Sequence, residues 1–244
     1  MRLENVAALV TGASSGIGQA VSSHFRREGA RLLLTGRREQ LDTAQPADLY
    51  VPGDLNDEAF VEALASQAAD SLGNVDVVVI NHGLQASSPL TEMPYEDAKN
   101  VLDSNLLSAF LVMKHFAPLM PPEGGSFVCI SSRLGMVGKP GEVLYSAAKG
   151  GLIMLAKGAA IEWAPRNIRV NVVAPGLTVT PVIEATFQRS PDPEAYRRER
   201  EMQIPLQRLA TPEEVADAAL FFASSESTYI TGAVLPVDGG YTAF

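Results

Sequence analysis

The sequence predicts an α/β fold in which one parallel sheet is covered by helices on both faces. Short apolar, β-rich runs alternate with longer stretches of helical periodicity along almost the whole chain. Continuous apolar strands of this kind are expected where both faces of a sheet are buried. No internal repeat, low-complexity tract or Pro/Gly-rich linker divides the 244 residues. We therefore expect a single doubly wound domain over residues 1–244, with a sheet of about seven strands.

The individual elements follow from the same periodicity. Strands are expected at residues 6–10, 32–35, 49–51, 75–80, 127–131, 168–173 and 233–237, and helices at 16–28, 57–71, 95–120 and 144–165. A further helix is expected after Thr211, which can cap it, with Pro212 and two glutamates in the first turn. Residues 175–193 predict an irregular loop over a site, with a substrate lid near residues 178–193.

Composition and charge exclude several classes of protein. The chain is 46% hydrophobic, and nowhere does it approach the ~18 consecutive apolar residues of a membrane-spanning helix. Its formal charge of −9 is the wrong sign for nucleic-acid binding. The N-terminus lacks the pattern of a secretory signal, so we expect a cytoplasmic protein that binds neither membrane nor nucleic acid.

The chain offers no obvious metal ligands or disulfides. It has a single cysteine, Cys129, which lies in an apolar run and is expected to be a buried, inert thiol. His24, His82 and His115 lie far apart, without the spacing of metal ligands. We therefore expect no metal site.

A glycine-rich segment follows the first expected strand. Residues 11–18 read Thr-Gly-Ala-Ser-Ser-Gly-Ile-Gly and lead directly into a helix. Glycines at such a junction let the backbone turn sharply and approach a pyrophosphate, while the helix N-terminus offers N–H groups to the anion. A tight turn without a ligand is the alternative, but the position after the first strand favours dinucleotide binding.

A second constellation lies further along the chain. Tyr145 and Lys149 are four residues apart, which places them on one face of the expected helix. A neighbouring ammonium is expected to lower the pKa of the tyrosine and make it a better proton carrier near neutral pH. By itself this pair is more often a surface pair. Ser132, however, ends an apolar strand at the sheet edge where ligands bind, and its hydroxyl can donate to a substrate oxygen.

The Gly-x3-Gly-x-Gly loop and the Tyr-x3-Lys pair together resemble the short-chain dehydrogenase/reductase family, and the resemblance extends from Thr11 to Gly240. It implies a Rossmann-type fold and hydride transfer between a nicotinamide cofactor and a secondary alcohol or ketone. Tyr145 would be the general acid/base, Ser132 would polarise the oxygen, and Lys149 would tune the tyrosine and hold the nicotinamide ribose. Asn105 matches the family's asparagine that holds a water in a proton relay, although it is equally consistent with ordinary mid-helix structure.

The resemblance also implies the cofactor contacts. Arg37 and Arg38 follow the second strand, at a position where an acidic residue would favour NAD, so we expect NADP(H). NAD(H) is the alternative cofactor, and a further alternative is that the two arginines are solvated loop residues without a role in binding. Asp54 is expected beside the adenine, or else as a helix cap, and a catalytic His82 is a remote alternative. The full set of expected cofactor contacts is Gly12, Ser14, Ser15, Gly16, Ile17, Gly18, Arg37, Arg38, Asp54, Leu55, Asn81, Gly83, Tyr145, Lys149, Pro175, Gly176, Thr178 and Thr180.

The substrate is expected to be a small carbonyl or alcohol compound. The pocket walls should come from residues 84–88, 133–144 and 178–193, which contribute apolar side chains at Leu134, Met136, Val137 and Leu144. Arg133, Glu142 and Gln85 are candidates for orienting a polar substituent, or else are exposed or structural residues.

Assembly and the competing functions complete the interpretation. In the family that the chain resembles, helices in the places of 95–120 and 144–165 pair between subunits and the C-terminal tail makes a second contact, so the resemblance implies a homotetramer, with a dimer second. Three alternatives to the NADP-linked reaction stay open: an NAD-linked dehydrogenase, a non-redox relative, and a cofactor-sensing binding protein. A sensor without turnover should have lost Tyr145 or Lys149, and neither is lost.

Overall fold

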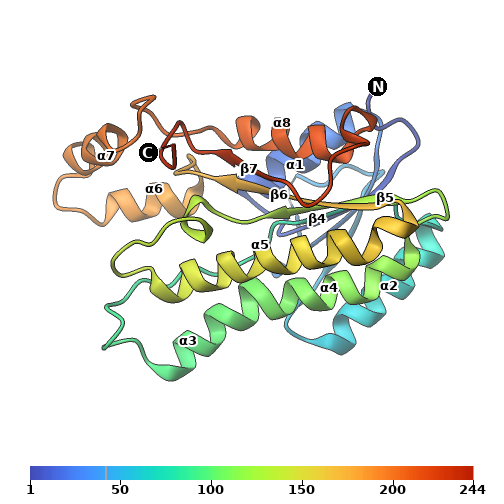
Figure 1. Cartoon of the computed structure of the whole chain (residues 1–244), viewed down its shortest axis with the longest axis horizontal. Coiled ribbons are helices and arrows are strands. Elements are labelled where there is room, and N and C mark those ends of the chain that lie inside the picture. Colours follow the sequence, from blue (N-terminus) through green and yellow to red (C-terminus); the bar gives the residue numbers. More distant parts are fainter. Residues whose placement is uncertain (42, 244) are drawn as a thin grey trace.

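The computed structural model describes residues 1–41 and 43–243, and the described strands form one seven-stranded parallel sheet (Figure 1). The strand order is β3-β2-β1-β4-β5-β6-β7. The strands are β1 (Ala7–Thr11), β2 (Arg31–Gly36), β3 (Leu49–Pro52), β4 (Val77–Ile80), β5 (Gly125–Ile130), β6 (Ile168–Pro175) and β7 (Val234–Val237). The predicted doubly wound parallel sheet is confirmed, and the strands differ from expectation only at their ends.

The order of the strands determines where a ligand can bind. The chain moves outward from β1 to β2 and β3, then returns to the other side of β1 to form β4. The crossovers after β1 and β4 therefore leave the sheet in opposite directions, which opens a crevice at the carboxyl ends of these two strands. All five residues of β1 and all four of β4 are buried, as expected for strands at the centre of a covered sheet.

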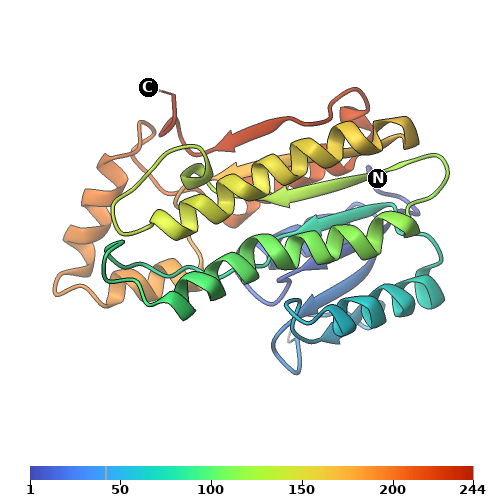
Figure 2. The same ribbon diagram turned by 60° about the horizontal axis from the view of Figure 1, so that its bottom comes forward.

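Helices cover both faces of the sheet, as Figures 1 and 2 show. On one face lie α1 (Gly16–Arg27) and α8 (Pro212–Ala223), which pack against each other. On the other lie α2 (Glu58–Leu72), α4 (Ser108–Phe116) and α5 (Val143–Trp163). At the carboxyl end of the sheet, α6 (Pro181–Gln188) and α7 (Pro193–Met202) extend beyond its edge (Figure 1).

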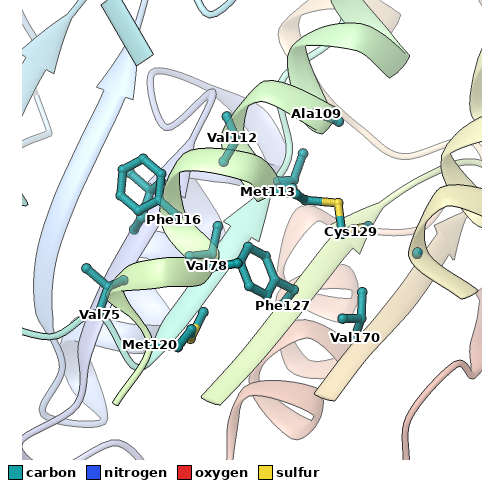
Figure 3. Packing of buried hydrophobic residues seen from close by; sticks show 14 of the residues in the cluster. Val75, Val78, Ala109, Val112, Met113, Phe116, Met120, Phe127, Cys129 and Val170 are labelled. Atoms are coloured by element: carbon teal, nitrogen blue, oxygen red, sulfur yellow. The ribbon is translucent and has the colours of Figure 1, made fainter. Parts of the chain in front are cut away.

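The larger of the two cores lies between the sheet and helices α2, α4 and α5. Phe116 and Met113 of α4 meet Val78 of β4 and Phe127 of β5 there (Figure 3). Truncating one buried phenylalanine in such a core costs about 3–5 kcal/mol, so this packing fixes α4 and α5 firmly on the sheet. Cys129 is part of the same cluster, and burial raises the pKa of its thiol to about 12, in line with the inert thiol that the sequence predicts.

The predicted helix at 95–120 is interrupted. It consists of α3 (Tyr95–Leu102), a π-helical turn at Asp103–Leu107, α4, and a final 3-10 turn at Ala117–Leu119. The hydrophobic period continues through the interruption, which is why periodicity alone does not reveal it. A π-turn inserts one extra residue into the helix and often lies at a functional site. Here it contains Asn105.

The predicted irregular loop at 175–193 is corrected, because α6 occupies much of it and α7 begins at its end. Thr180 caps α6 by accepting a hydrogen bond from the backbone N–H of Ile183 at 3.4 Å. Asp192 caps α7 in the same way through Ala195 at 2.9 Å. In both helices a proline occupies the first turn, so the start signals were present in the sequence. No helix within residues 1–41 and 43–243 has both the length and the apolar character needed to cross a membrane.

The start of α8 has the cap that the sequence predicts. Thr211 Oγ1 accepts from Glu214 N at 3.3 Å, and the Glu214 carboxylate accepts from Thr211 N at 2.8 Å. This reciprocal pair satisfies two N–H groups that the helix itself leaves unpaired.

We expect Thr211→Ala to lower the free energy of unfolding by about 1 kcal/mol, because one of these N–H groups loses its partner. Denaturant titration of both proteins measures the difference. Thr91→Ala is the matched control, since Thr91 is exposed and makes no side-chain hydrogen bond within the described chain. Equal losses in the two variants would show that the cap contributes nothing specific.

Candidate active site

Two adjoining cavities lie at the carboxyl ends of β1, β2, β4, β5 and β6. The first, of about 460 Å³, is lined by the glycine-rich segment and the ends of β2 and β3. The second, of about 400 Å³, is lined by the predicted catalytic residues. The residues that line both are Ile17, Arg37, Asn81, Gly83, Leu84, Thr180 and Val182. The two cavities therefore form one continuous, elongated site, as an extended dinucleotide and its substrate require.

The glycine-rich segment has the conformation that only glycine allows at two positions. Gly12 and Gly16 have φ angles of +63° and +55°. A Cβ at Gly18 would lie 2.2 Å from the carbonyl oxygen of Gly12, so no larger residue fits between the loop and α1. Asn81 holds the turn from the next strand, because its Nδ2 donates to the carbonyls of Thr11 and Gly12 at 3.2 and 3.1 Å.

The first turn of α1 is open to an anion. Its N-cap residue, Ser15, makes no side-chain capping bond, and the turn contains no acidic residue. The N–H groups at the start of the helix are therefore available to an anion, and the positive end of the helix dipole favours one. Together with the room that the glycines leave, this fits the pyrophosphate of a dinucleotide.

The two arginines after β2 line the first cavity. Arg37 lines both cavities, and Arg38 lines the first and donates to the carbonyl of Ser14 at 3.4 Å. Asp54 also lines this cavity, and its Oδ1 accepts from Asn56 N at 3.0 Å. The alternative that Asp54 caps the next helix is wrong, because Asp57 is the N-cap of α2.

All four predicted catalytic residues, Asn105, Ser132, Tyr145 and Lys149, line the second cavity. Tyr145 and Lys149 lie on successive turns of α5, and Lys149 Nζ is 5.9 Å from the centre of the Tyr145 ring. Ser132 follows the end of β5 and lines the same cavity. The Ser131 hydroxyl donates to the carbonyl of Lys149 at 2.9 Å and so fixes α5 against β5. Nothing in the sequence marks this contact of Ser131.

The expected lowering of the Tyr145 pKa by Lys149 is wrong for the cofactor-free protein. Burial raises the pKa of Tyr145 to about 12, with the charge of Glu142 adding to the rise and hydrogen bonding with Ser132 opposing it. Burial also lowers the pKa of Lys149 to about 8. Its Nζ donates to the carbonyl of Ile130 at 3.2 Å. Burial thus shifts the pKa of each group toward its neutral form, yet at neutral pH Tyr145 is a phenol and Lys149 is still mostly an ammonium.

Asn105 lies behind this group, in the π-turn. It is only 1% exposed, and its Nδ2 donates to the carbonyls of Leu84 and Val101 at 2.7 and 2.8 Å. Its Oδ1 is buried and has no protein partner. A Cβ at Gly83 would lie 2.4 Å from this oxygen and 3.3 Å from Lys149 Nζ, so both atoms face the same small space. A water molecule or a ligand hydroxyl group in this space could bridge the Asn105 oxygen and the Lys149 ammonium by hydrogen bonds.

His82 has a structural environment. Its Nδ1 lies 2.8 Å from Thr11 Oγ1, and its Nε2 lies 2.8 Å from Ser108 Oγ. Burial lowers its pKa to about 3, with the positive charge of Lys149 adding to the effect. The ring is therefore neutral at ordinary pH and joins β1 to α4. The remote alternative of a catalytic histidine has no support here.

The remaining predicted contacts lie at the end of β6. Pro175, Gly176, Thr178 and Thr180 all line the second cavity. The Thr178 hydroxyl donates to the carbonyl of Gly176 at 3.2 Å, and the residue is 3% exposed.

The expected substrate walls are present only in part. Among the apolar candidates Leu134 lines the second cavity, whereas Met136, Val137 and Leu144 do not. Gln85 lines it as well, and donates to Glu142 Oε1 at 2.9 Å. The alternative that Arg133 and Glu142 are exposed is wrong, since they are 3% and 5% exposed. No group of three or more His, Cys, Asp or Glu side chains in the described part of the chain is arranged to hold a metal ion.

Comparison with known proteins agrees with this geometry. A family model described as enoyl-(acyl carrier protein) reductase matches residues 12–242. The chain is 39% identical to the 3-oxoacyl-[acyl-carrier-protein] reductase FabG of Thermotoga maritima, over 98% of this chain and 99% of that protein. It is 38% identical to cis-4-hydroxycyclohexanecarboxylate dehydrogenase of Sinomonas cyclohexanicum, over 97% and 96% of the two chains.

Solved structures match equally well. A short-chain dehydrogenase/reductase of Burkholderia xenovorans, described as putative, superposes with a TM-score of 0.94 at 33% identity, covering 100% of this chain and 98% of that one. The ligand-free aldohexose dehydrogenase of Thermoplasma acidophilum gives a TM-score of 0.93 at 29% identity, with 99% and 96% covered. The protein is thus an NAD(P)-dependent oxidoreductase acting on CH–OH groups, and it belongs to the short-chain dehydrogenase/reductase family.

Proposed function

We propose that the protein interconverts a secondary alcohol and a ketone with NADP(H), and that Tyr145 carries the proton. The observation that carries this proposal is the meeting of Tyr145, Lys149 and Ser132 in one cavity that continues into the glycine-lined one. A non-redox relative or a sensor would not need this combination of a proton carrier with an open dinucleotide cradle. Relatives named as a 3-oxoacyl reductase and a hydroxycyclohexanecarboxylate dehydrogenase support the same class of reacting group.

The chain's own residues would divide the work as follows. The bound nicotinamide supplies or accepts the hydride. Ser132 donates a hydrogen bond to the substrate oxygen and stabilises the negative charge that develops on it. Because burial raises the pKa of Tyr145 to about 12, the side chain is a phenol at neutral pH and can donate its proton to that oxygen during ketone reduction. Lys149, as an ammonium, stabilises the phenolate left behind and binds the nicotinamide ribose.

Asn105 would supply the next step of the proton path. Its unpaired Oδ1 faces the space beside Lys149 Nζ, where a water molecule would accept a hydrogen bond from Nζ and donate one to Oδ1. We propose that protons reach Tyr145 from solvent through this water and the lysine. Asn105 then acts through its neighbours and does not itself touch the substrate.

The preference for NADP(H) rests on Arg37 and Arg38. Both line the first cavity at the end of β2, and neither forms an ion pair with a described residue. A guanidinium matches a phosphate with a fork of donors, which suits the 2′-phosphate of NADP(H). Leu55 and Asp54 would border the adenine from the other side. NAD(H) is the second candidate.

We also propose a cytoplasmic homotetramer of single-domain subunits. Large apolar side chains are exposed on α4 and α5, including Phe110 at 45%, Met154 at 64% and Ile161 at 79%. Apolar surface on paired helices is typical of an interface between subunits. Residues 178–193, which include α6, would form the lid of the second cavity, and Val182 and Ile183 of this segment line it. Light scattering tests the assembly, because a particle of 26.0 kDa would contradict it.

The cofactor preference predicts a binding experiment. We expect the wild type to bind NADPH at least ~10-fold more tightly than NADH, and Arg37→Ala to lose most of this margin, because a charge-assisted hydrogen bond contributes about 1.5–3 kcal/mol. Quenching of Trp163 fluorescence measures both dissociation constants. Arg31→Ala is the matched control, since Arg31 starts the same strand at the opposite edge of the sheet. Equal affinity of the wild type for both cofactors would reverse the assignment.

The proton role of Tyr145 predicts a pH profile. Lys149 is protonated below its pKa of about 8 and loses its charge above it, so ketone reduction should be constant at lower pH and decline above about 8. The negative charges of a bound cofactor would raise the pKa of Lys149, so the decline would then begin at a higher pH. Tyr145→Phe should lose ~10²-fold or more in kcat at every pH while it keeps its affinity for NADPH.

Two results would argue against these roles. One is a reduction rate that rises with pH between 7 and 9. The other is a Tyr145→Phe variant that reduces ketones at the wild-type rate.

A further inference from the structure

Arg133 is a buried cation that the chemistry described above does not use. It follows Ser132 directly, in the short 3-10 turn Arg133–Gly135, and it lines the second cavity. The residue is only 3% exposed, and its buried Nη1 has no hydrogen-bond partner. Burial of a charge without a partner is strongly unfavourable, so native proteins rarely keep one without a function.

A stacked aromatic ring holds the guanidinium in place without using its donors. The Arg133 guanidinium carbon lies 3.6 Å from the centre of the Tyr241 ring. Such stacking occupies the flat face of the group, whereas its N–H donors lie in the plane. The arrangement therefore fixes the orientation of the group and leaves its donors to a ligand.

The neighbouring acids do not neutralise Arg133. The Asp238 carboxylate accepts from Gly240 N at 2.9 Å, Thr242 N at 3.0 Å and Thr242 Oγ1 at 2.6 Å, so it is engaged by its own turn. Glu142 accepts from Gln85 at 2.9 Å and does not line the cavity. Neither acid forms an ion pair with Arg133 within the described residues.

Two further cationic side chains, Lys139 and Arg200, lie close enough to interact electrostatically with the groups of this cavity. Lys139 lines the same cavity, and burial lowers its pKa, with the charges of Arg200 and Arg133 adding to the effect and the charge of Glu142 opposing it. The pKa of Arg133 is likewise lowered by burial, with Arg200 adding to the effect, while Tyr241 and Asp238 oppose it. One side of the second cavity thus has an excess of positive charge that an anion would relieve.

We infer that the substrate carries a carboxylate, which the Arg133 guanidinium binds while the reacting carbonyl lies at Ser132 and Tyr145. The inference rests on the proposed function, because it names the substrate class of that same site. A planar carboxylate matches the in-plane donors of arginine with two parallel hydrogen bonds. Since the cavity of about 400 Å³ must also receive the nicotinamide end of the cofactor, the substrate is a small keto or hydroxy acid.

Paired substrates test this inference. We would measure kcat/KM with NADPH for 4-oxopentanoate and 4-oxocyclohexanecarboxylate, each beside its uncharged methyl ester. The wild type should favour the acids by roughly 10- to 100-fold, the range for a hydrogen bond to a charged group. Arg133→Gln should lose this preference and keep its rate on the esters, and Arg133→Lys should keep part of it. Arg198→Gln is the matched control, because it removes an exposed charge from the nearby helix α7.

A binding experiment separates failure of this inference from failure of the proposed function. Titration calorimetry with cyclohexanecarboxylate, which has no reacting carbonyl, should show binding to the wild type and at least ~10-fold weaker binding to Arg133→Gln. Cyclohexanecarboxamide should bind both equally. The melting temperature of Arg133→Gln should not fall, because the variant removes an unpaired buried charge. Lys139→Gln, at a less buried position, should weaken binding of the acid in the same direction.

Either of two results would overturn the inference. The first is equal binding of the acid and the amide by the wild type. The second is an acid preference that survives in Arg133→Gln. Reduction of the esters with NADPH in either case would leave the proposed oxidoreductase function intact.

Discussion

The burial of Lys149 is the constraint on which the rest of the site depends. Its ammonium group is carried into the protein by α5, where the residue is 4% exposed and burial lowers its pKa to about 8. The carbonyl of Ile130 is one partner, at 3.2 Å. Because a buried cation with so little compensation is costly, the protein has to supply further polar groups around it. The unpaired oxygen of Asn105 faces the same small space as Lys149 Nζ, and the Tyr145 ring centre lies 5.9 Å from Nζ.

The fold places these groups by a few close contacts. Gly83 lets the Asn105 oxygen and Lys149 Nζ face one small space, because any side chain there would occupy it. The π-turn adds one residue to the long helix at that point and so brings Asn105 to the required position while the rest of the helix keeps its packing on the sheet (Figure 3). At the other end of the site, the positive φ angles of Gly12 and Gly16 open the first turn of α1. The backbone conformation at these few positions therefore determines both how the helices pack on the sheet and how the groups of the site are placed.

The sequence predicts the sheet and the position of the site well, because both follow from strong patterns. Buried parallel strands are continuous apolar runs, and the residues after them meet at one edge. This pattern indicates Ser132 and Arg37, whereas Tyr145 follows from its spacing to Lys149. Ser132 and Tyr145 line the second cavity, and Arg37 lines both cavities. The errors in the predicted secondary structure lie mainly in the segment after β6, where the alternation of apolar strands and helices is no longer clear. Helix α6 lies inside the segment that the sequence predicts as a loop, because its proline and cap residues are also common in loops, and α7 lies almost wholly in a stretch for which the sequence predicts no element.

Electrostatics could not be predicted from spacing. The four-residue interval between Tyr145 and Lys149 predicts proximity correctly, yet the direction of the tyrosine pKa depends on burial, which is a property of the whole fold. The same applies to Arg133, whose sequence context does not distinguish an exposed arginine from one stacked on Tyr241 over a hundred residues later. Sequence patterns identify the groups of the site, and their protonation states follow only from the tertiary structure.

The most direct test of this account is the titration of Lys149 itself. Protein labelled with ¹³C at the lysine Cε would be followed by NMR, with Lys149→Arg to assign the signal. We expect the cofactor-free protein to show one lysine that titrates near 8, and this value to rise when NADP⁺ and its phosphates bind. A Lys149 that titrates near ~10.4, like a solvated lysine, would contradict the burial on which the site depends.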